Sequence, residues 1–106
     1  MRIFEANFLE DHSEDLYGLW EVRWYLDVKN VHTIDEQIIF LIDLVERRLV
    51  DVFIAYDPSN HGEALSRTPA LDKVNDLGYW NAPEQGFRGP LCYISASQNG
   101  SSLQNA

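Results

Sequence analysis

The sequence predicts a small α+β domain with two N-terminal helices, a β-hairpin, a short third helix and a last strand. Three observations support this class. Thr33 and Glu36 have the spacing of a capping box and open a helical repeat of apolar residues. Residues 50–56 are rich in β-branched and aromatic side chains, and residues 91–94 form a second apolar run. Helices and strands segregated in this way are typical of α+β domains.

The first predicted helix begins near Asp11 or Ser13 and ends at about Lys29. Asp11 and Glu14 have the spacing of a capping box. On a helical wheel this segment has two apolar stripes rather than one. The aromatic stripe consists of Tyr17, Trp20, Trp24 and Val28, and the aliphatic stripe consists of Leu19, Val22 and Leu26. A helix that is apolar on two sides is normally packed between two layers. We therefore expect Trp20 and Trp24 to form one wall of the core, with the loop around Trp80 as its cover. The alternative is that this aromatic stripe is left for a partner.

The second predicted helix follows Thr33 and has a single apolar stripe. That stripe consists of Ile34, Ile38, Leu41, Ile42, Val45 and Leu49. After the strand at residues 50–56, the turn residues 57–62 lead into a short return strand at residues 63–66. Thr68 and Pro69 then open a short helix that ends near Asp76, with Gly78 as its stop signal. The order of elements is reminiscent of winged-helix proteins.

The length of 106 residues accommodates one domain. We assign residues 1–95 to it and residues 96–106, which are rich in Ser, Asn and Gln, to a flexible polar tail. The single cysteine, Cys92, excludes an intrachain disulfide and fits a reducing compartment. The first residues lack the pattern of a secretory signal, and the longest apolar run, residues 38–42, is too short to span a membrane. A cytoplasmic location is expected.

The charge balance is strongly acidic, with seventeen Asp and Glu against eight Lys and Arg and a formal net charge of −9. Nucleic acids and anionic membranes require the opposite sign, and the turn of the predicted hairpin carries no Lys or Arg. The sequence therefore argues against binding to either. It suits a basic protein partner reached by electrostatic steering. An acidic surface that serves only solubility is the alternative.

No motif for catalysis, metal binding or cofactor binding occurs in the sequence. His12, His32 and His61 do not have the spacing of two metal ligands on one helix, and we expect them to be solvated. Cys92 lies in an apolar strand, where burial makes a thiol inert. We therefore predict no metal, no cofactor and no enzymatic activity.

Glu21 is the one carboxylate with a conceivable chemical role. It borders the aromatic stripe, and burial against tryptophan would raise its pKa, as in a general acid. The sequence offers no companion acid or base. The alternative is a structural glutamate that pairs with Arg88, Lys73 or a backbone amide.

Two acidic groups are candidates for binding a partner. The first is the run at the start of the first predicted helix, where the helix dipole by itself would also stabilise negative charge. The second is the outer face of the second helix, where Phe40 would be an apolar anchor within a polar rim. The alternative for Phe40 is that a second layer of the fold covers it. The candidate partner-binding residues are Asp11, Glu14, Asp15, Glu36, Phe40, Asp43 and Glu46.

Three short motifs resemble a group of small acidic bacterial proteins. They are Leu-Trp-Glu-Val at residues 19–22 followed by Trp24, Arg-Leu-Val-Asp-Val at residues 48–52, and Trp-Asn-Ala-Pro at residues 80–83. Some proteins of this group are similar to immunity proteins encoded beside secreted toxins. The resemblance covers roughly residues 16–95, and it implies a single acidic domain with no catalytic residue to assign.

Three functions are therefore ordered by their support. The first is an immunity-type protein that inhibits a cationic, nuclease-like toxin by occlusion. The second is an accessory or regulatory domain of winged-helix-like shape that acts through protein contacts. The third is a small enzyme that uses Glu21. The sequence leaves the oligomeric state open.

Overall fold

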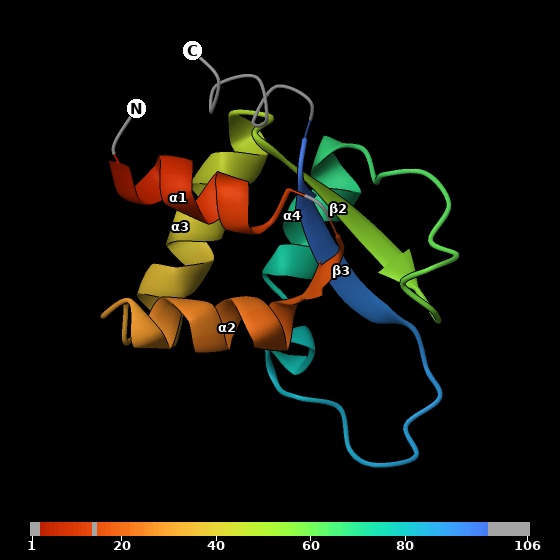
Figure 1. Ribbon diagram of the computed structural model, residues 1–106. Helices are drawn as coiled ribbons and strands as arrows, with labels where there is room; N and C mark the ends of the chain where they lie inside the picture. Colours follow the sequence, from red (N-terminus) through yellow and green to blue (C-terminus); the bar gives the residue numbers. More distant parts are fainter. Residues whose placement is uncertain (1–2, 14, 98–106) are drawn as a thin grey trace.

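The computed structural model describes residues 3–13 and 15–97 of the chain (Figure 1). The α+β class is confirmed, with four α-helices and a three-stranded antiparallel sheet in this part of the chain. The elements in order are α1 (Ile3–Asp11), β1 (Tyr17–Gly18), α2 (Leu19–Val28), α3 (Ile34–Glu46), β2 (Val50–Ala55), α4 (Arg67–Val74), a single 3-10 turn η1 (Leu77–Trp80) and β3 (Leu91–Ala96).

The sheet has the strand order β1-β3-β2, so the last strand of the chain lies at its centre. β3 pairs along its whole length with β2, from Val50 opposite Ala96 to Ala55 opposite Leu91. On its other side it pairs with the two residues of β1. Side chains on both faces of β3 are buried, Cys92 and Ile94 in one cluster and Tyr93 in another, which explains the apolar run of residues 91–94.

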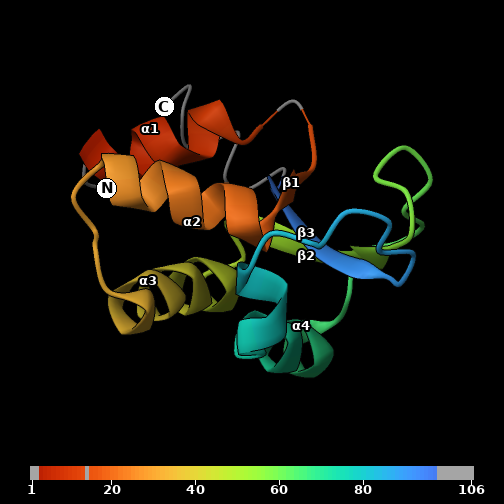
Figure 2. The ribbon, with the colours of Figure 1, turned by 90° about the horizontal axis from the view of Figure 1, so that it is seen from below.

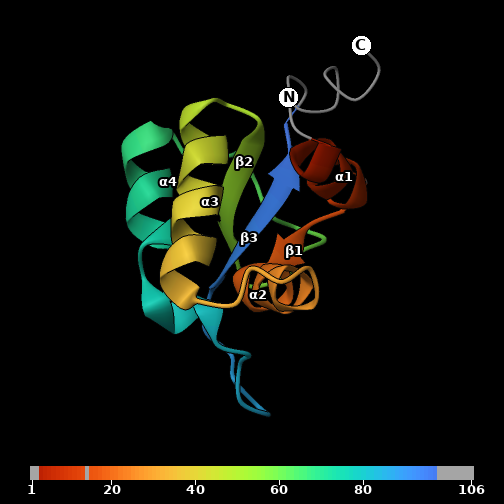
Figure 3. The same ribbon diagram turned by 90° about the vertical axis from the view of Figure 1, so that its left-hand side faces the viewer.

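One face of the sheet and the helices enclose the main core. Val52 and Ile94 are paired in the sheet and are almost completely buried there. Leu19, Val22 and Leu26 of α2 meet residues of α1, α3 and α4 in the same cluster. Figure 1 shows α1, α2 and α3 to one side of the sheet, with the loops 57–66 and 81–90 extending away on the other. In Figure 3, α3 and α4 lie side by side.

The other face of the sheet carries a smaller cluster of Phe53, Ala55 and Tyr93. Trp20 covers part of it, and its ring meets the Tyr93 ring edge to face at 5.8 Å. Gly18 makes this possible, because a Cβ atom at that position would lie 2.1 Å from the Trp20 ring. Any larger residue at position 18 would therefore displace the tryptophan.

The N-terminal region differs from the prediction of a single helix from Asp11 to Lys29. Residues 3–11 form α1, which the sequence analysis missed, and the chain then enters β1 before α2 begins. The reason is pairing with β3. The backbone carbonyl of His12 accepts a hydrogen bond from the Ala96 N–H at 2.8 Å, and Tyr17 lies opposite Ile94. These long-range contacts override the helical periodicity of the segment.

The predicted hairpin is also different, because β2 pairs with β3 and not with residues 63–66. The return segment lies beside β2 through one backbone bond, from the Leu65 N–H to the Val52 carbonyl at 2.8 Å. In the described residues, the winged-helix-like succession therefore lacks its wing. The C-terminal boundary shifts as well. Ala96 belongs to β3 and the Ser97 N–H donates to the Leu49 carbonyl, while the rest of the predicted tail, residues 98–106, lies outside the described residues.

Two helices end in the same way, with a residue in the left-handed conformation. Asn30 follows α2 with φ of 70°, and Arg48 follows α3 with φ of 60°. In each case the next residue closes the helix end with a backbone bond, from Val31 to Leu26 and from Leu49 to Leu44. Glycine and asparagine are the usual residues here, because a Cβ atom makes this conformation unfavourable. Arginine at position 48 is therefore a strained choice.

Replacing Arg48 with glycine is expected to raise the free energy of unfolding by about 1 kcal/mol, because glycine adopts positive φ without steric cost. This corresponds to a rise of roughly 4 °C in the thermal midpoint. Asn30→Gly is the matched control and should change the midpoint much less, because asparagine already tolerates this conformation. Thermal unfolding of the three proteins checks this, and a lower midpoint for Arg48→Gly would contradict it.

Candidate functional site

Of the acidic run, Glu10 and Asp11 lie in the last turn of α1 and Asp15 follows the helix, so these residues are not at the start of a helix as expected. At a helix C-terminus the dipole disfavours negative charge, so other contacts must hold these carboxylates. Asp11 is exposed and accepts a hydrogen bond of 2.7 Å from the Tyr25 hydroxyl. Asp15 is exposed and accepts one of 2.8 Å from the Leu16 N–H. Glu14, the third candidate of this run, lies outside the described residues.

His12, within the same run, is buried, although the sequence analysis placed it in solvent. Its Nδ1 lies 2.7 Å from the Phe8 carbonyl, and its ring stacks on the Phe8 ring at 4.1 Å. A carbonyl only accepts, so Nδ1 carries the proton and donates. Burial lowers the pKa of His12, and the backbone bond and the carboxylates of Asp11 and Glu21 oppose this without reversing it. His12 is thus a core residue in the neutral form.

The candidate carboxylates on α3 are exposed, but two of them are already paired. Asp43 contacts Arg47 at 2.8 Å, and the same guanidinium reaches Glu5 of α1 at 3.1 Å. Glu46 contacts Arg67 of α4 at 3.0 Å. Glu36 lies in the first turn of α3 and makes no ion pair within the described part of the chain. Exposed pairs contribute little to stability, so these carboxylates stay available to a stronger partner.

Phe40, the proposed apolar anchor of this face, is covered by α1. Its ring meets the rings of Phe4 and Phe8 edge to face, at 5.3 and 5.1 Å. It is half-buried and packs against the main core. The exposed apolar side chain on α3 is its neighbour Ile39, with 67% of its surface accessible. The structure thus shows the covering layer that the sequence analysis gave as the alternative.

The aromatic stripe of α2 is divided between the interior and solvent. Trp20 is half-buried against Tyr93, whereas Trp24 has 68% of its surface exposed and Val28 has 59%. The expectation that Trp24 forms a wall of the core is wrong, because the aliphatic stripe is the one that faces the core. Both stripes are apolar at helical spacing, so periodicity alone does not show which one the rest of the chain covers. Trp80 is buried, but in the cluster that contains the aliphatic stripe rather than as a cover over Trp20 and Trp24, and its indole N–H donates to the Val74 carbonyl at 2.7 Å.

Glu21 is exposed and lies at the start of α2. Its Oε1 accepts a hydrogen bond of 3.0 Å from the Gly18 N–H, which satisfies an amide at the helix N-terminus. Burial against tryptophan was the basis of its candidacy as a general acid, and the structure does not provide it. Glu21 is thus a structural glutamate that pairs with a backbone amide, which was the alternative to a general acid.

The thiol and the possible metal-binding side chains of the described residues form no reactive or metal-binding site. Burial raises the pKa of the Cys92 thiol to about 12, which disfavours the reactive thiolate. In residues 3–13 and 15–97, no three His, Cys, Asp or Glu side chains are grouped so that they could hold a metal ion. None of the helices in the same residues is both long and apolar enough to cross a membrane.

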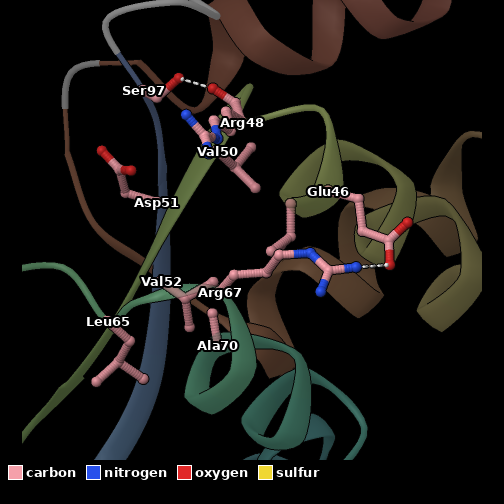
Figure 4. Close-up of a pocket in the computed structure, with 10 residues that line it drawn as sticks. Glu46, Arg48, Val50, Asp51, Val52, Leu65, Arg67, Ala70 and Ser97 are labelled. Carbon is pink, nitrogen blue, oxygen red and sulfur yellow. Dashed lines mark hydrogen bonds and ion pairs between the residues drawn. The ribbon is translucent and has the colours of Figure 1, made fainter.

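A cleft of about 460 Å³ lies where the end of α3, the edge of β2 and the start of α4 meet (Figure 4). Its apolar floor includes Val45, Val50, Val52 and Ala70. Two arginines line it, Arg48 at the end of α3 and Arg67 on α4, together with the carboxylates of Glu46 and Asp51. Figure 2 shows α4 beside the β2 edge of the sheet. This cleft could not be predicted from the sequence, because the residues that line it come from separate segments of the chain.

Comparisons of the chain with protein-family models, with curated proteins and with solved structures gave no match. The geometry of the described residues therefore carries the assignment of function.

Replacing Phe40 with alanine is expected to lower the free energy of unfolding by about 2 kcal/mol, because its ring fills the contact between α1 and α3. Ile39→Ala, at the adjacent exposed position, is the matched control and should change it by less than about 0.5 kcal/mol. Chemical denaturation measures both. Equal effects would mean that α1 does not cover this part of α3.

Acidification should destabilise the fold through His12. In the unfolded chain its pKa returns to the ordinary 6.5, whereas burial lowers it in the folded protein. As the pH falls below that value, the unfolded chain binds a proton that the folded protein resists. The free energy of unfolding then falls by at most about 1.4 kcal/mol per pH unit from this group. Chemical denaturation at several values between roughly pH 7.5 and 5.5 measures this dependence of the unfolding free energy on pH. His12→Gln should reduce the dependence. His32→Gln, at an exposed position, is the control and should retain it.

Proposed function

We propose that this protein is an immunity-type inhibitor, which binds a cationic protein such as a nuclease-like toxin and occludes it. The observation that carries the proposal is an exposed tryptophan on a strongly acidic domain. Trp24 has 68% of its surface accessible in a chain with a formal net charge of −9. Tryptophan is among the residues most enriched at the energetic centres of protein interfaces.

The surroundings of Trp24 on α2 are suited to an interface. On a helix the neighbours of a residue lie three and four positions away. For Trp24 these are Trp20 and Val28 along one diagonal, and Glu21 and Asp27 along the other. Val28, Glu21 and Asp27 are exposed, and Trp20 is half-buried. An aromatic centre with a carboxylate rim fits a partner that presents Lys or Arg around an apolar depression.

The carboxylates of α1 and α3 would extend this acidic surface rather than anchor it. Asp43 and Glu46 exchange their present arginine partners for the solvent or a toxin at small cost, because both pairs are exposed. Long-range attraction needs only the net charge, and it accelerates encounter with a basic protein. Inhibition by occlusion requires no catalytic group, which agrees with the sequence analysis.

The experiment is co-expression with the product of the neighbouring gene, scored by survival of the cells and by isolation of a complex. The wild-type chain is expected to protect and to form a complex that weakens with increasing salt. Neither protection nor a complex would overturn the proposal.

Within such a complex, Trp24→Ala is expected to weaken binding by at least about tenfold, because it removes the aromatic centre. Its thermal midpoint should stay close to the wild-type value, since the side chain is largely exposed. Ile39→Ala, which removes an equally exposed apolar side chain from α3, is the matched control and should leave affinity unchanged. Titration calorimetry measures both, and unchanged affinity of Trp24→Ala would remove α2 from the interface.

A further inference from the structure

The outer edge of β2 has no partner strand among the described residues at the end where β2 begins, although the Val50 side chain itself is buried. The Val52 carbonyl points away from β3, because it accepts the Leu65 N–H from the other side. Alternate residues of a strand direct their backbone groups to the same side, so those of Val50 point outward as well. Within residues 3–13 and 15–97, the N–H and carbonyl of Val50 have no hydrogen-bond partner. Leu65 shows how an extended segment docks on this edge.

The cleft of about 460 Å³ lies along this open edge. Val50 and Val52 contribute both to the edge and to the apolar floor. Its size is within the range of sites that bind small ligands or a few residues of a peptide. Backbone groups at the rim and an apolar floor are the features by which sheet edges bind extended peptides.

Arg48 supplies a free positive charge at this position. In Figure 4 its side chain lies beside Val50. Among the described residues its guanidinium has no hydrogen-bond or ion-pair partner. The same residue occupies the left-handed conformation, where glycine would be more stable. The position is strained for an arginine and the fold makes no use of its charge, which favours a role for this side chain in binding a ligand.

The other charged side chains that line the cleft are less available to a ligand than Arg48. Arg67 pairs with Glu46 at 3.0 Å, and with 65% of its side chain exposed it keeps further N–H groups for a ligand. Asp51 follows Val50 in the strand, so its side chain starts from the opposite face of the sheet. The charge of Arg48 favours an anionic ligand, and the N–H and carbonyl of Val50 require an acceptor and a donor side by side, as a peptide backbone provides.

We propose that this cleft binds an extended peptide segment that carries a carboxylate, which adds to the open edge of β2. The peptide exchanges two backbone hydrogen bonds with Val50, directs apolar side chains to the floor, and pairs its carboxylate with Arg48 and with the free N–H groups of Arg67. Guanidinium groups bind carboxylates through paired hydrogen bonds, which favours this ligand. This site does not involve Trp24, and of the acidic surface it includes only Glu46, the ion-pair partner of Arg67. Peptide binding is therefore tested separately from the proposed inhibition.

The test is a titration of the isotope-labelled full chain with acetyl-Val-Glu-Val-Glu-Val-amide, followed by NMR. The Val50 and Val52 amide signals are expected to shift, and Arg48→Gly should weaken binding by about tenfold through loss of the charged contacts. Because glycine suits this position, the variant should remain folded, and its thermal midpoint verifies that. Arg88→Gly is the matched control. It removes the same charge from an exposed loop residue that does not line the cleft, and it should bind like the wild type.

Two further ligands test separately whether binding requires the carboxylate and whether it requires the peptide backbone. The uncharged peptide acetyl-Val-Gln-Val-Gln-Val-amide should bind about tenfold more weakly than the acidic one. Inorganic phosphate should not produce the shift of the Val50 amide. Equal binding of the two peptides, equal binding by Arg48→Gly, or the same Val50 shift with phosphate would each overturn the assignment of a carboxylate-bearing peptide.

Discussion

The pairing of β3 with strands on both of its sides is the constraint on which the rest of the structure depends. β3 comes last in the sequence but lies at the centre of the sheet, with β2 along its full length and β1 on its other edge. To reach β1, the chain must leave helical conformation after Asp11 and resume it at Leu19. The apolar N-terminal segment thereby becomes a separate helix, α1, which lies across α3. Long-range strand pairing has thus decided the layout of the helices.

One consequence is an exchange of roles between two aromatic residues. Because α1 covers α3, Phe40 packs against Phe4 and Phe8 and is no longer a surface anchor. Because α2 turns its aliphatic stripe to the core, Trp24 is left in solvent. The carboxylates around Trp24 belong to the same helix and are exposed as well. The acidic composition is unchanged, and the exposed aromatic side chain that could serve as an apolar centre for the proposed partner lies on α2 rather than on α3.

A second consequence concerns the edges of the sheet. Because β2 pairs with β3 rather than with residues 63–66, the described part of the chain bonds to its outer edge at one place, where the Leu65 N–H meets the Val52 carbonyl. An open edge risks uncontrolled association, which charged residues usually prevent. Arg48 and the Arg67–Glu46 pair stand at this position. Charged side chains at a sheet edge disfavour pairing with another strand. The positive charge of Arg48 would in addition favour an acidic ligand over a basic one.

The sequence by itself determined the α+β class, α3 with its Thr33 cap, the strand at residues 50–55, and the burial of Cys92. These follow from local signals: capping boxes, hydrophobic period and β-branched runs act over a few residues. The tertiary structure decided which stripe of α2 is buried, which strand pairs with β2, the burial of His12, and the cleft at Arg48. Each of these depends on segments far apart in the chain, and a local pattern has no information on which of two equally apolar surfaces a distant segment will cover.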